Sequence, residues 1–466
     1  MGDVVIMSLH IIVLAAGQGK RMHSSKSKVL QPLAGKPMLE RVVETAKQLN
    51  PEGIYVIYGH GGEQIKNALP ELPVQWVLQE EQLGTGHAVM QALPSIPPKS
   101  QVLVLSADVP LIQVDTLRNF VALCRVETFQ RAPLGLLVTE LEDPFGLGRI
   151  VRDEQGKIRA IVEEKDAQAH ERHIQEIYSG VCCADVADLL RWLPNLSASN
   201  AQNEYYLTEI IAMAAREGVP IESFSTPDSL EVKGVNNFEQ LQHLERTFQQ
   251  RQAKQLMLSG VRLADAARID IRGELTCGKD VFIDVNAVFE GDVRLGDHCV
   301  IEPNCLLKNV TLGDHCVVHA NSVLENCHIG DQCQVGPFAR LRPGTRLANR
   351  CKIGNFVETK NAILGENSKA SHLSYLGDAD IGQNVNIGAG TITCNYDGAN
   401  KSKTIIEDGV FVGSDTQLVA PLTVGKNATI GAGSTIRKDV PPDELTLTVS
   451  TQKTVAGWKR PVKKHE

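Results

Sequence analysis

The chain has 466 residues, enough for two or three domains, and its 42% hydrophobic and 22% charged residues are ordinary for a soluble globular protein. Its formal net charge of −8 argues against nucleic acid as the main partner, because a phosphate-binding surface usually carries a basic excess. No apolar run approaches the length of a membrane span, and the segment up to Leu14 lacks the basic start of a secretory signal peptide.

The first predicted element is a buried parallel strand at residues 9–14, followed by a glycine-rich turn at 15–19. Backbone N–H groups of such a turn can approach phosphates or a base. Arg21 and Lys28 follow closely and can supply cationic donors to a polyphosphate. A helix over 38–48 and a strand over 54–58 complete a βαβ unit.

The next two predicted strands end in polar residues. The strand at 74–78 runs into a polar loop at 79–88, and the strand at 102–105 leads to Asp108. Open α/β sheets bind ligands at the carboxyl ends of their strands. Mg²⁺ prefers one or two carboxylates plus substrate phosphates, so Asp108 is a natural ligand for it. A helix cap is the alternative role for this aspartate.

The segment at 134–165 has the pattern of antiparallel strands, and the stretch 203–208 opens a helix. A further helix, from Phe238 to about Met257, is polar with a narrow apolar stripe that is typical of an exposed connecting arm. We therefore expect three parts: a first domain at 1–236, a helical arm at 237–258 and a second domain at 259–466.

From about Ile283 to Val440 an aliphatic residue recurs every six positions. No helix has this period, but a solenoid with three short strands per turn does. The step shortens to five at several places, for example from Leu307 to Leu312, as tightened corners would require. An eleven-residue polar loop at 394–404 interrupts the pattern, and such loops are usually functional.

Six of the eleven cysteines stand two residues before an inward aliphatic residue, a position that favours small buried side chains. Three of these should stack, one coil apart: Cys299, Cys316 and Cys333. A zinc site would prefer a tight Cys-x-x-Cys pair, which the sequence lacks. Free thiols in this number favour a reducing compartment, hence the cytoplasm. The six are Cys299, Cys305, Cys316, Cys327, Cys333 and Cys351.

Three segments, 14–22, 81–88 and 234–237, resemble the sugar-phosphate nucleotidyltransferases. Segment 386–398 resembles one family more narrowly, the bifunctional bacterial enzymes that join glucosamine-1-phosphate acetyltransferase to N-acetylglucosamine-1-phosphate uridylyltransferase. The resemblance covers nearly the whole chain. It implies an α/β Rossmann-like nucleotidyltransferase domain, a helical arm and a left-handed parallel β-helix of hexapeptide repeats that forms a homotrimer.

The implied reactions are acetyl transfer from acetyl-CoA to glucosamine-1-phosphate, then UTP-dependent uridylylation to UDP-N-acetylglucosamine, a precursor of peptidoglycan and lipopolysaccharide. In the first domain the resemblance places Mg²⁺ on Asp108 and Asn236. This chain has Tyr178 where the family has Asn, and a tyrosine is larger and lacks the paired donor and acceptor of an amide. The implied nucleotide and sugar contacts are Leu14, Ala15, Ala16, Gly17, Arg21, Lys28, Gln79, Gly84, Thr85, Ser106, Asp108, Gly148, Glu163, Tyr178 and Asn236.

In the second domain the resemblance makes His372 the general base that deprotonates the attacking amine. A histidine suits this role because its pKa lies near the working pH. The implied sugar-phosphate contacts are Arg342, Lys360, Tyr375, Asn386 and Lys401. The implied acetyl-CoA contacts are Ala389, Asn395, Tyr396, Ser414 and Ala432.

Three alternatives stay open at this point. A single-activity nucleotidyltransferase with a regulatory β-helix does not account for His372 or the loop at 395–398. A zinc lyase in the manner of γ-class carbonic anhydrases would need three converging ligands. A non-enzymatic scaffold is the third alternative. The histidines that raise the zinc alternative are His298, His315, His319 and His328.

Overall fold

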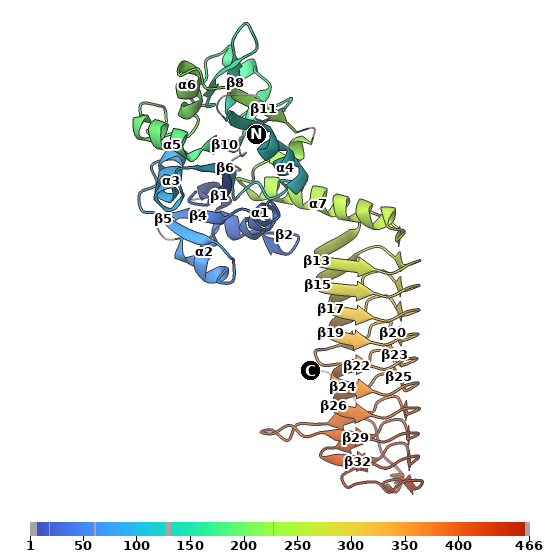
Figure 1. Ribbon diagram of the computed structural model, residues 1–466. Helices are drawn as coiled ribbons and strands as arrows, with labels where there is room; N and C mark the ends of the chain where they lie inside the picture. Colours follow the sequence, from blue (N-terminus) through green and yellow to red (C-terminus); the bar gives the residue numbers. More distant parts are fainter. Residues whose placement is uncertain (1–6, 18, 60–61, 126–131, 227, 462–466) are drawn as a thin grey trace, which may run out of the picture. The chain divides into compact units, whose positions relative to one another are not determined.

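The computed structural model describes residues 7–17, 19–59, 62–125, 132–226 and 228–461 (Figure 1). It divides into two compact units, Met1–Phe248 and Gln249–Glu466, and the division falls within helix α7 (Phe238–Leu258). The first six residues, part of the stretch that we searched for a signal peptide, lie outside the described residues.

The first unit is built on a nine-stranded sheet with the order β11-β7-β10-β6-β1-β4-β5, and the pair β8 and β9 extends it from β10. Strands β1, β4, β5 and β6 are parallel, as the βαβ pattern predicts, whereas β10 runs antiparallel to β6 and β7. The strands are β1 Ser8–Leu14, β4 Gly53–Gly59, β5 Gln75–Gln79, β6 Ser100–Ser106, β7 Leu134–Glu140, β8 Arg149–Arg152, β9 Ile158–Val162, β10 Glu176–Asp185 and β11 Ile221–Ser225.

Both faces of the central strands are buried, which explains their continuous hydrophobic sequence. Ile12 and Val104 pack into the core on one face, and Ile11 and Leu103 pack into the core on the other. Helices cover these cores: α1 Met38–Lys47, α2 Glu63–Ala68, α3 Thr85–Ala92, α4 Val114–Cys124, α5 Val186–Trp192 and α6 Glu209–Arg216. Helix α6 begins directly after the 203–208 stretch that we expected to open it.

The carboxyl ends of β1, β4 and β6 lie side by side. The N–H of Ala15 donates to the carbonyl of Ile57 at 2.8 Å, and the N–H of Ala107 donates to the carbonyl of Leu14 at 3.0 Å. The loops that follow these strands therefore leave the sheet at one edge, as expected for a ligand site in an open α/β sheet.

Helix α7 is less exposed than its narrow apolar stripe led us to expect. Leu241 and Leu244 are buried in a cluster that includes Met22 and Val235. The guanidinium of Arg41 lies 4.3 Å from the centre of the Phe248 ring. The helix thus presents a buried face, although Phe238 at its start stays exposed.

The second unit is a parallel β-helix. Most strands pair with the strand one coil later, 17 or 18 residues on, for example Val300 with Val317 and Phe282 with Val300. The offset is larger in the coil that contains the polar loop, where Asn386 pairs with Phe411. The residues at the hexad positions are buried in one continuous core, so the predicted period is confirmed. The shorter coils are those in which the spacing between two inward aliphatic residues falls from six positions to five.

The strands of this unit form two long parallel sheets. The first contains β12 Arg262–Leu263, β14 Phe282–Ile283, β16 Val300–Ile301, β18 Val317–Val318, β20 Gln334–Val335, β23 Lys352–Asn355, β25 Lys369–His372, β27 Asn386–Ile387, β30 Phe411–Val412, β33 Thr429–Ile430 and β35 Leu445–Thr446. The second contains β13 Ile269–Cys277, β15 Ala287–Leu295, β17 Leu306–Leu312, β19 Val323–Ile329, β21 Arg340–Leu341, β22 Arg346–Leu347, β24 Glu358–Leu364, β26 Tyr375–Ile381, β28 Ile392–Cys394, β29 Thr404–Ile406, β31 Gln417–Val419, β32 Leu422–Val424 and β34 Thr435–Ile436.

The inward cysteines behave as predicted. All six are buried, and all eleven cysteines of the chain are free thiols. Cys299, Cys316 and Cys333 occupy equivalent positions in successive coils, and their thiols donate to the carbonyls of Gly313, Gly330 and Ala348 at 3.1, 3.0 and 3.1 Å. They act as small core residues.

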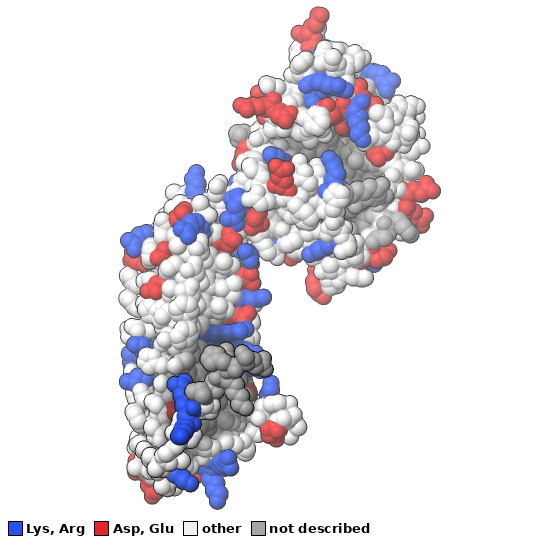
Figure 2. All heavy atoms as spheres, turned by 180° about the vertical axis from the view of Figure 1, so that it is seen from behind, with Lys and Arg blue, Asp and Glu red and all other residues white. Residues whose placement is uncertain are grey.

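The polar loop at 394–404 is a short hairpin that connects β28 to β29 and projects from the stack (Figure 1). Tyr396 and Lys401 face each other in an antiparallel bridge, and the N–H of Ser402 donates to the carbonyl of Asn395 at 2.9 Å. On the face that Figure 2 shows, Lys and Arg are interspersed with Asp and Glu rather than gathered into one basic surface. No helix in the described residues is long and apolar enough to cross a membrane.

Candidate active sites

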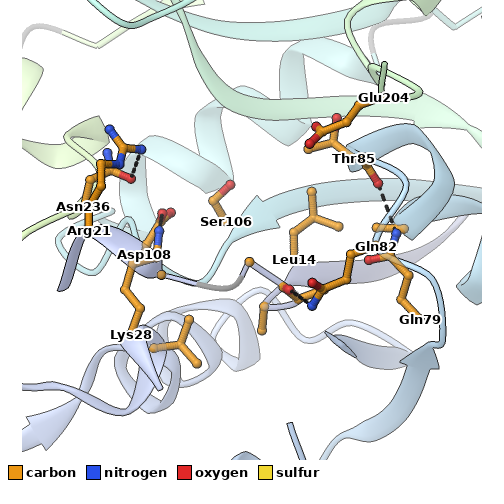
Figure 3. Close-up of a pocket in the computed structure, with 17 residues that line it drawn as sticks. Leu14, Arg21, Lys28, Gln79, Gln82, Thr85, Ser106, Asp108, Glu204 and Asn236 are labelled. Atoms are coloured by element: carbon orange, nitrogen blue, oxygen red, sulfur yellow. Dashed lines mark hydrogen bonds and ion pairs between the residues drawn. The ribbon is translucent and has the colours of Figure 1, made fainter. Parts of the chain in front are cut away.

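A pocket of about 530 Å³ opens where β1, β5 and β6 end (Figure 3). Most of the residues predicted for the nucleotide site line it: Leu14, Ala15, Ala16, Gly17, Arg21, Lys28, Gln79, Gly84, Thr85, Ser106, Asp108 and Asn236. Gly19, Gln82 and Ala88 belong to the predicted motifs at 14–22 and 81–88 but were not named as contacts. Five lining residues in all were not predicted as contacts: Gly19, Val29, Gln82, Ala88 and Glu204. Its size suits a small ligand, since such pockets span roughly 300–1,000 Å³.

Two basic side chains in this pocket each contact one of the predicted metal ligands. The ammonium of Lys28 pairs with the Asp108 carboxylate, and Arg21 donates to Oδ1 of Asn236 at 3.0 Å (Figure 3). The N–H of Val235 donates to the carbonyl of Asp108 at 2.9 Å, which ties the segment before α7 to the end of β6. The pocket therefore gathers two cations and two oxygen ligands from four segments.

The loop after β5 is held by backbone contacts. Gly84 has φ +113°, and a Cβ there would lie 2.7 Å from the carbonyl oxygen of Tyr205, so only glycine fits. The N–H of Tyr205 donates to the carbonyl of Leu83 at 2.7 Å. The N–H of Leu207 donates to the hydroxyl of Thr85 at 3.0 Å. These contacts fix the loop on which Gln79, Gly84 and Thr85 stand.

Gly148, Glu163 and Tyr178, predicted to contact the sugar, do not line this pocket. They form a group of their own: Gly148 directly precedes β8, Glu163 directly follows β9, and Tyr178 stands on β10. The N–H of Tyr178 donates to the carbonyl of Gly148 at 2.9 Å, and Thr208 donates its hydroxyl to Glu163 at 3.1 Å.

Burial raises the pKa of Glu163. Burial also raises the pKa of Tyr178 well above its ordinary value, with the neighbouring Cys182 adding to the shift. In both cases burial disfavours the charged form of the side chain relative to the same group in water.

The β-helix carries a second site around His372, which lies exposed at the end of β25. Its Nδ1 is 2.8 Å from Oδ1 of Asn355, the residue in register with it one coil earlier. An amide oxygen only accepts, so Nδ1 donates a proton to it, and in the neutral ring the lone pair is then on Nε2. Asn355 was not selected from the sequence, although its place 17 residues before His372 could have pointed to it.

Three cations gather on a neighbouring face of the β-helix. Arg342 and Lys360 follow Arg340 and Glu358, which pair in register, so they stand one above the other in consecutive coils. Lys401 reaches them from the hairpin: its contact with Lys360, and then the charge of Arg342, lower the pKa of Lys360. Like charges this close favour the binding of an anion between them.

Tyr375 lies beside these cations. It follows Glu358 in the register, and its ring packs over Gly377, where a Cβ would come within 2.4 Å of the tyrosine hydroxyl. Gly377 is the residue in register with Lys360, and because it has no side chain it leaves room for the Tyr375 ring. Asn386 begins the strand of the next coil on the His372 side.

Small residues occupy the positions equivalent to His372 in the following coils, and we call this row of positions the column above His372. The register of Lys369, Asn386, Phe411 and Thr429 places Ala389, Ser414 and Ala432 at the position of His372 in three successive coils. On the hairpin, Asn395 donates to the Asp378 carboxylate at 2.5 Å, and the Tyr396 hydroxyl donates to the carbonyl of Gly398 at 2.6 Å. The predicted acetyl-CoA residues thus form a narrow ledge flanked by the hairpin.

The histidines that raised the zinc alternative are partly stacked. The rings of His298 and His315 lie 4.6 Å apart and 12° from parallel. Among the residues that the structure describes, no three His, Cys, Asp or Glu side chains converge as a metal cage.

The family comparisons agree with this division into two sites. Residues 11–134 match the MobA-like NTP transferase domain, residues 271–350 the GMPPB C-terminal domain, and residues 403–438 the bacterial transferase hexapeptide (six repeats). The repeats and the parallel sheets are those of a left-handed parallel β-helix. The protein is thus a nucleotidyltransferase domain joined to a hexapeptide-repeat transferase domain.

Full-length relatives narrow this class. The chain is 67% identical to the Bifunctional protein GlmU of Legionella pneumophila (strain Lens), over 98% of this chain and 99% of that protein. It is 56% identical to the Bifunctional protein GlmU of Marinobacter nauticus, with the same coverage. The chain belongs to the bifunctional GlmU family.

It is therefore a bifunctional transferase, a glucosamine-1-phosphate N-acetyltransferase and UDP-N-acetylglucosamine diphosphorylase. This assignment does not favour the alternative of a single-activity nucleotidyltransferase. Nucleotidyltransferases of this family generally use a divalent metal. A solved UDP-glucose pyrophosphorylase in complex with UDP-glucose matches 53% of this chain and all of that one, at 18% identity and TM-score 0.43, which is too distant to add to the assignment.

Proposed function

We propose that the pocket of the first unit transfers UMP from UTP to N-acetylglucosamine-1-phosphate, and that the His372 site acetylates glucosamine-1-phosphate. The observation that carries this proposal is that each unit has its own cationic cluster beside its own reactive groups. Two assays on the wild-type protein test it: CoA release with glucosamine-1-phosphate and acetyl-CoA, and pyrophosphate release with N-acetylglucosamine-1-phosphate and UTP. Absence of either product contradicts the corresponding half of the proposal.

In uridylyl transfer a phosphate oxygen of the sugar phosphate attacks the α-phosphorus of UTP, and pyrophosphate leaves from the opposite side. Catalysis of this kind consists mainly of positioning and of neutralising negative charge. Lys28 and Arg21 supply positive charge from the floor of the pocket. The base of UTP is assigned to the side of the pocket lined by Gln79, Gly84 and Thr85. Its phosphates are assigned to the turn at 14–17.

We propose Mg²⁺ as the divalent metal. Asp108 and Asn236 offer hard oxygen ligands in the pocket wall, and Mg²⁺ characteristically takes one or two such ligands together with substrate phosphates. When bound, Mg²⁺ supplies charge that stabilises the phosphates and the leaving pyrophosphate. Lys28 and Arg21, which contact these same oxygens, are placed to act on the phosphates beside it.

The sugar of N-acetylglucosamine-1-phosphate is assigned to the group made by Gly148, Glu163 and Tyr178. Gly180 stands on the same strand as Tyr178, and a Cβ built at Gly180 would lie 3.4 Å from the hydroxyl of Ser106, which lines the pocket. This closeness supports a sugar subsite that continues from the nucleotide pocket.

In acetyl transfer the amine nitrogen of glucosamine-1-phosphate attacks the thioester carbonyl of acetyl-CoA. The new C–N bond replaces the C–S bond, Nε2 of His372 accepts the amine proton, and CoA leaves as the thiolate that this proton then neutralises. The Asn355 contact supports this role, because it places the proton of the neutral ring on Nδ1 and so makes Nε2 the basic nitrogen.

The three cations Arg342, Lys360 and Lys401 are assigned to the phosphate of the amino sugar, and Tyr375 and Asn386 to its ring. Ala389, Ser414 and Ala432 are assigned to the extended arm of acetyl-CoA. Their small side chains leave backbone groups within reach along the column above His372. Asn395 and Tyr396 flank the arm from the hairpin.

A homotrimer is proposed through the β-helix. Three apolar side chains near His372 are exposed by half or more: Phe338 by 50%, Phe356 by 55% and Leu373 by 63%. The two phenylalanine rings stack at 5.5 Å. An exposed apolar group of this kind favours burial against another protein surface, here a second copy of the chain. The eleven free thiols support a cytoplasmic location.

A further inference from the structure

Gln79, the last residue of β5, lines the nucleotide pocket and is buried. Its amide nitrogen donates to the carbonyl of Gly84 at 3.1 Å and lies 3.0 Å from Nδ1 of His87. A primary amide has two N–H groups and one acceptor oxygen. If Nδ1 of His87 accepts, both N–H groups are used and Oε1 is the only polar atom left. Within the described part of the chain, Oε1 has no partner.

The carbonyl of Gly84 decides the orientation of this amide. With the amide reversed, Oε1 would stand 3.1 Å from another acceptor in a buried place, without compensation. The nitrogen therefore faces Gly84, and His87 must accept at Nδ1 and carry its proton on Nε2.

Gln91 gives the one contact that opposes this tautomer. Its amide nitrogen lies 3.2 Å from Nε2 of His87 and donates to the His87 carbonyl at 3.1 Å. With a proton on Nε2, the first of these contacts is lost. Gln91 is only half-buried, so water can replace that contact, whereas the buried Gln79 has no such substitute. The conflict is therefore resolved on the Gln91 side.

The His87 ring is held in place by its surroundings. It lies in the first turn of α3, with its centre 6.5 Å from the ring of Tyr205. The N–H of Gly86 donates to the carbonyl of Tyr205 at 2.8 Å, and the next two helix residues, Ala88 and Val89, are buried. A fixed acceptor preorganises the amide that it contacts.

We propose that His87 sets the nucleotide specificity of the first site by fixing Gln79 with Oε1 toward the base. This rests on the proposed placement of the UTP base against Gln79. Uracil has an N–H at ring position 3, which an oxygen can accept. Cytosine, of nearly equal size, has a bare acceptor nitrogen there, and two facing acceptors repel. His87 does not line the nucleotide pocket, so it acts through Gln79 as a positioning residue. A site organised in this way rejects a mismatched isostere.

The test compares kcat/KM for UTP and CTP, by pyrophosphate release, in the wild type and in His87→Ala, His87→Gln and Gln79→Ala. We expect the UTP-to-CTP ratio to fall about tenfold or more in His87→Ala, because the amide can then turn over. His87→Gln, whose side-chain oxygen can accept from Gln79, should recover most of the ratio. CoA release, which depends on the other unit, serves as the folding control.

The three variants and the wild type separate this proposal from the placement of UTP. If Gln79→Ala lowers the ratio but His87→Ala leaves it unchanged, the role of His87 is overturned and the placement of the base stands. If Gln79→Ala changes neither kcat/KM nor the affinity for UTP in calorimetry, the base does not lie against Gln79 and both proposals fall.

Discussion

Asn355 and His372 stand in register on adjacent coils, and Oδ1 of the amide lies 2.8 Å from Nδ1 of the imidazole. The pair converts an exposed histidine into one with a defined tautomer, whose Nε2 is available as a base. The regular stack of the β-helix creates this contact, since residues 17 apart fall directly above each other.

Removing the acceptor should impair acetyl transfer without removing the base. For Asn355→Ala we expect the kcat of CoA release to fall roughly tenfold, less than the 10²–10⁴-fold contribution of a general base. Asn355→Asp, which keeps an acceptor oxygen at this place, should restore most of the rate. An unchanged kcat in Asn355→Ala would remove Asn355 from the mechanism.

The cationic group at Arg342, Lys360 and Lys401 should act mainly on binding. Arg342→Gln removes one charge next to the proposed phosphate, and a hydrogen bond to a charged group is worth about 1.5–3 kcal/mol. We expect KM for glucosamine-1-phosphate to rise about tenfold or more, with KM for acetyl-CoA little changed.

The matched control for Arg342→Gln is Arg294→Gln. Both arginines pair with a carboxylate, Arg342 with Glu358 at 2.8 Å and Arg294 with Asp292 at 2.8 Å, and Arg294 stands on an earlier coil. Equal KM values in the two variants would contradict the assignment of Arg342 to the phosphate.

Glu163 should make the stability of the first unit depend on pH. Burial raises its pKa above the ordinary value of 4.5, so folding favours the protonated form. This cost is absent below the pKa of the unfolded chain and grows as the pH rises through the folded-state pKa. Glu163→Gln, which stays neutral, should therefore raise the Tm of the first unit near pH 7.5 but not near pH 4. If calorimetry gave the same difference in Tm between Glu163→Gln and the wild type at both pH values, ionisation of Glu163 would not be the cause of that difference.

The apolar group formed by Phe338, Phe356 and Leu373 should hold the trimer together. Phe356→Asp places a charge where we expect a buried contact, and burying an unpaired charge is strongly unfavourable. Light scattering after gel filtration should show trimers for the wild type and smaller species for the variant. CoA release should be lost and pyrophosphate release kept.

Phe145→Asp is the control for this charge, since Phe145 is 78% exposed in the first unit. It should remain trimeric. A trimeric Phe356→Asp variant would exclude this group from the interface.

Much of the fold follows from the sequence because its signals are local and repeated. The hexad period marks each inward side chain of the β-helix, since every coil repeats the same backbone path. The nucleotide pocket was predicted where polar residues follow buried parallel strands. Glu204 was missed as a contact because the stretch 203–208 predicted only the start of a helix, and its place at the pocket depends on the tertiary fold.

Contacts that depend on the tertiary arrangement were less accessible. Asn355 gains its role only from the coil above it, and the pairing of Gln79 with His87 requires the tight turn at Gly84. The apolar stripe of α7 was visible in the sequence, but the surface that buries Leu244 was not. The roles of Gly148, Glu163 and Tyr178 remain predictions, because these residues stand beside the pocket rather than in its lining.

The central claim is that two independent sites lie in one chain, and it is tested most directly by measuring both reactions in His372→Ala and in Asp108→Ala. We predict that His372→Ala loses CoA release by about 10²-fold or more and keeps pyrophosphate release. Asp108→Ala should show the reverse, with metal-dependent pyrophosphate release lost and CoA release kept. If either variant loses both activities while remaining folded, or keeps the activity assigned to its site, the account is contradicted.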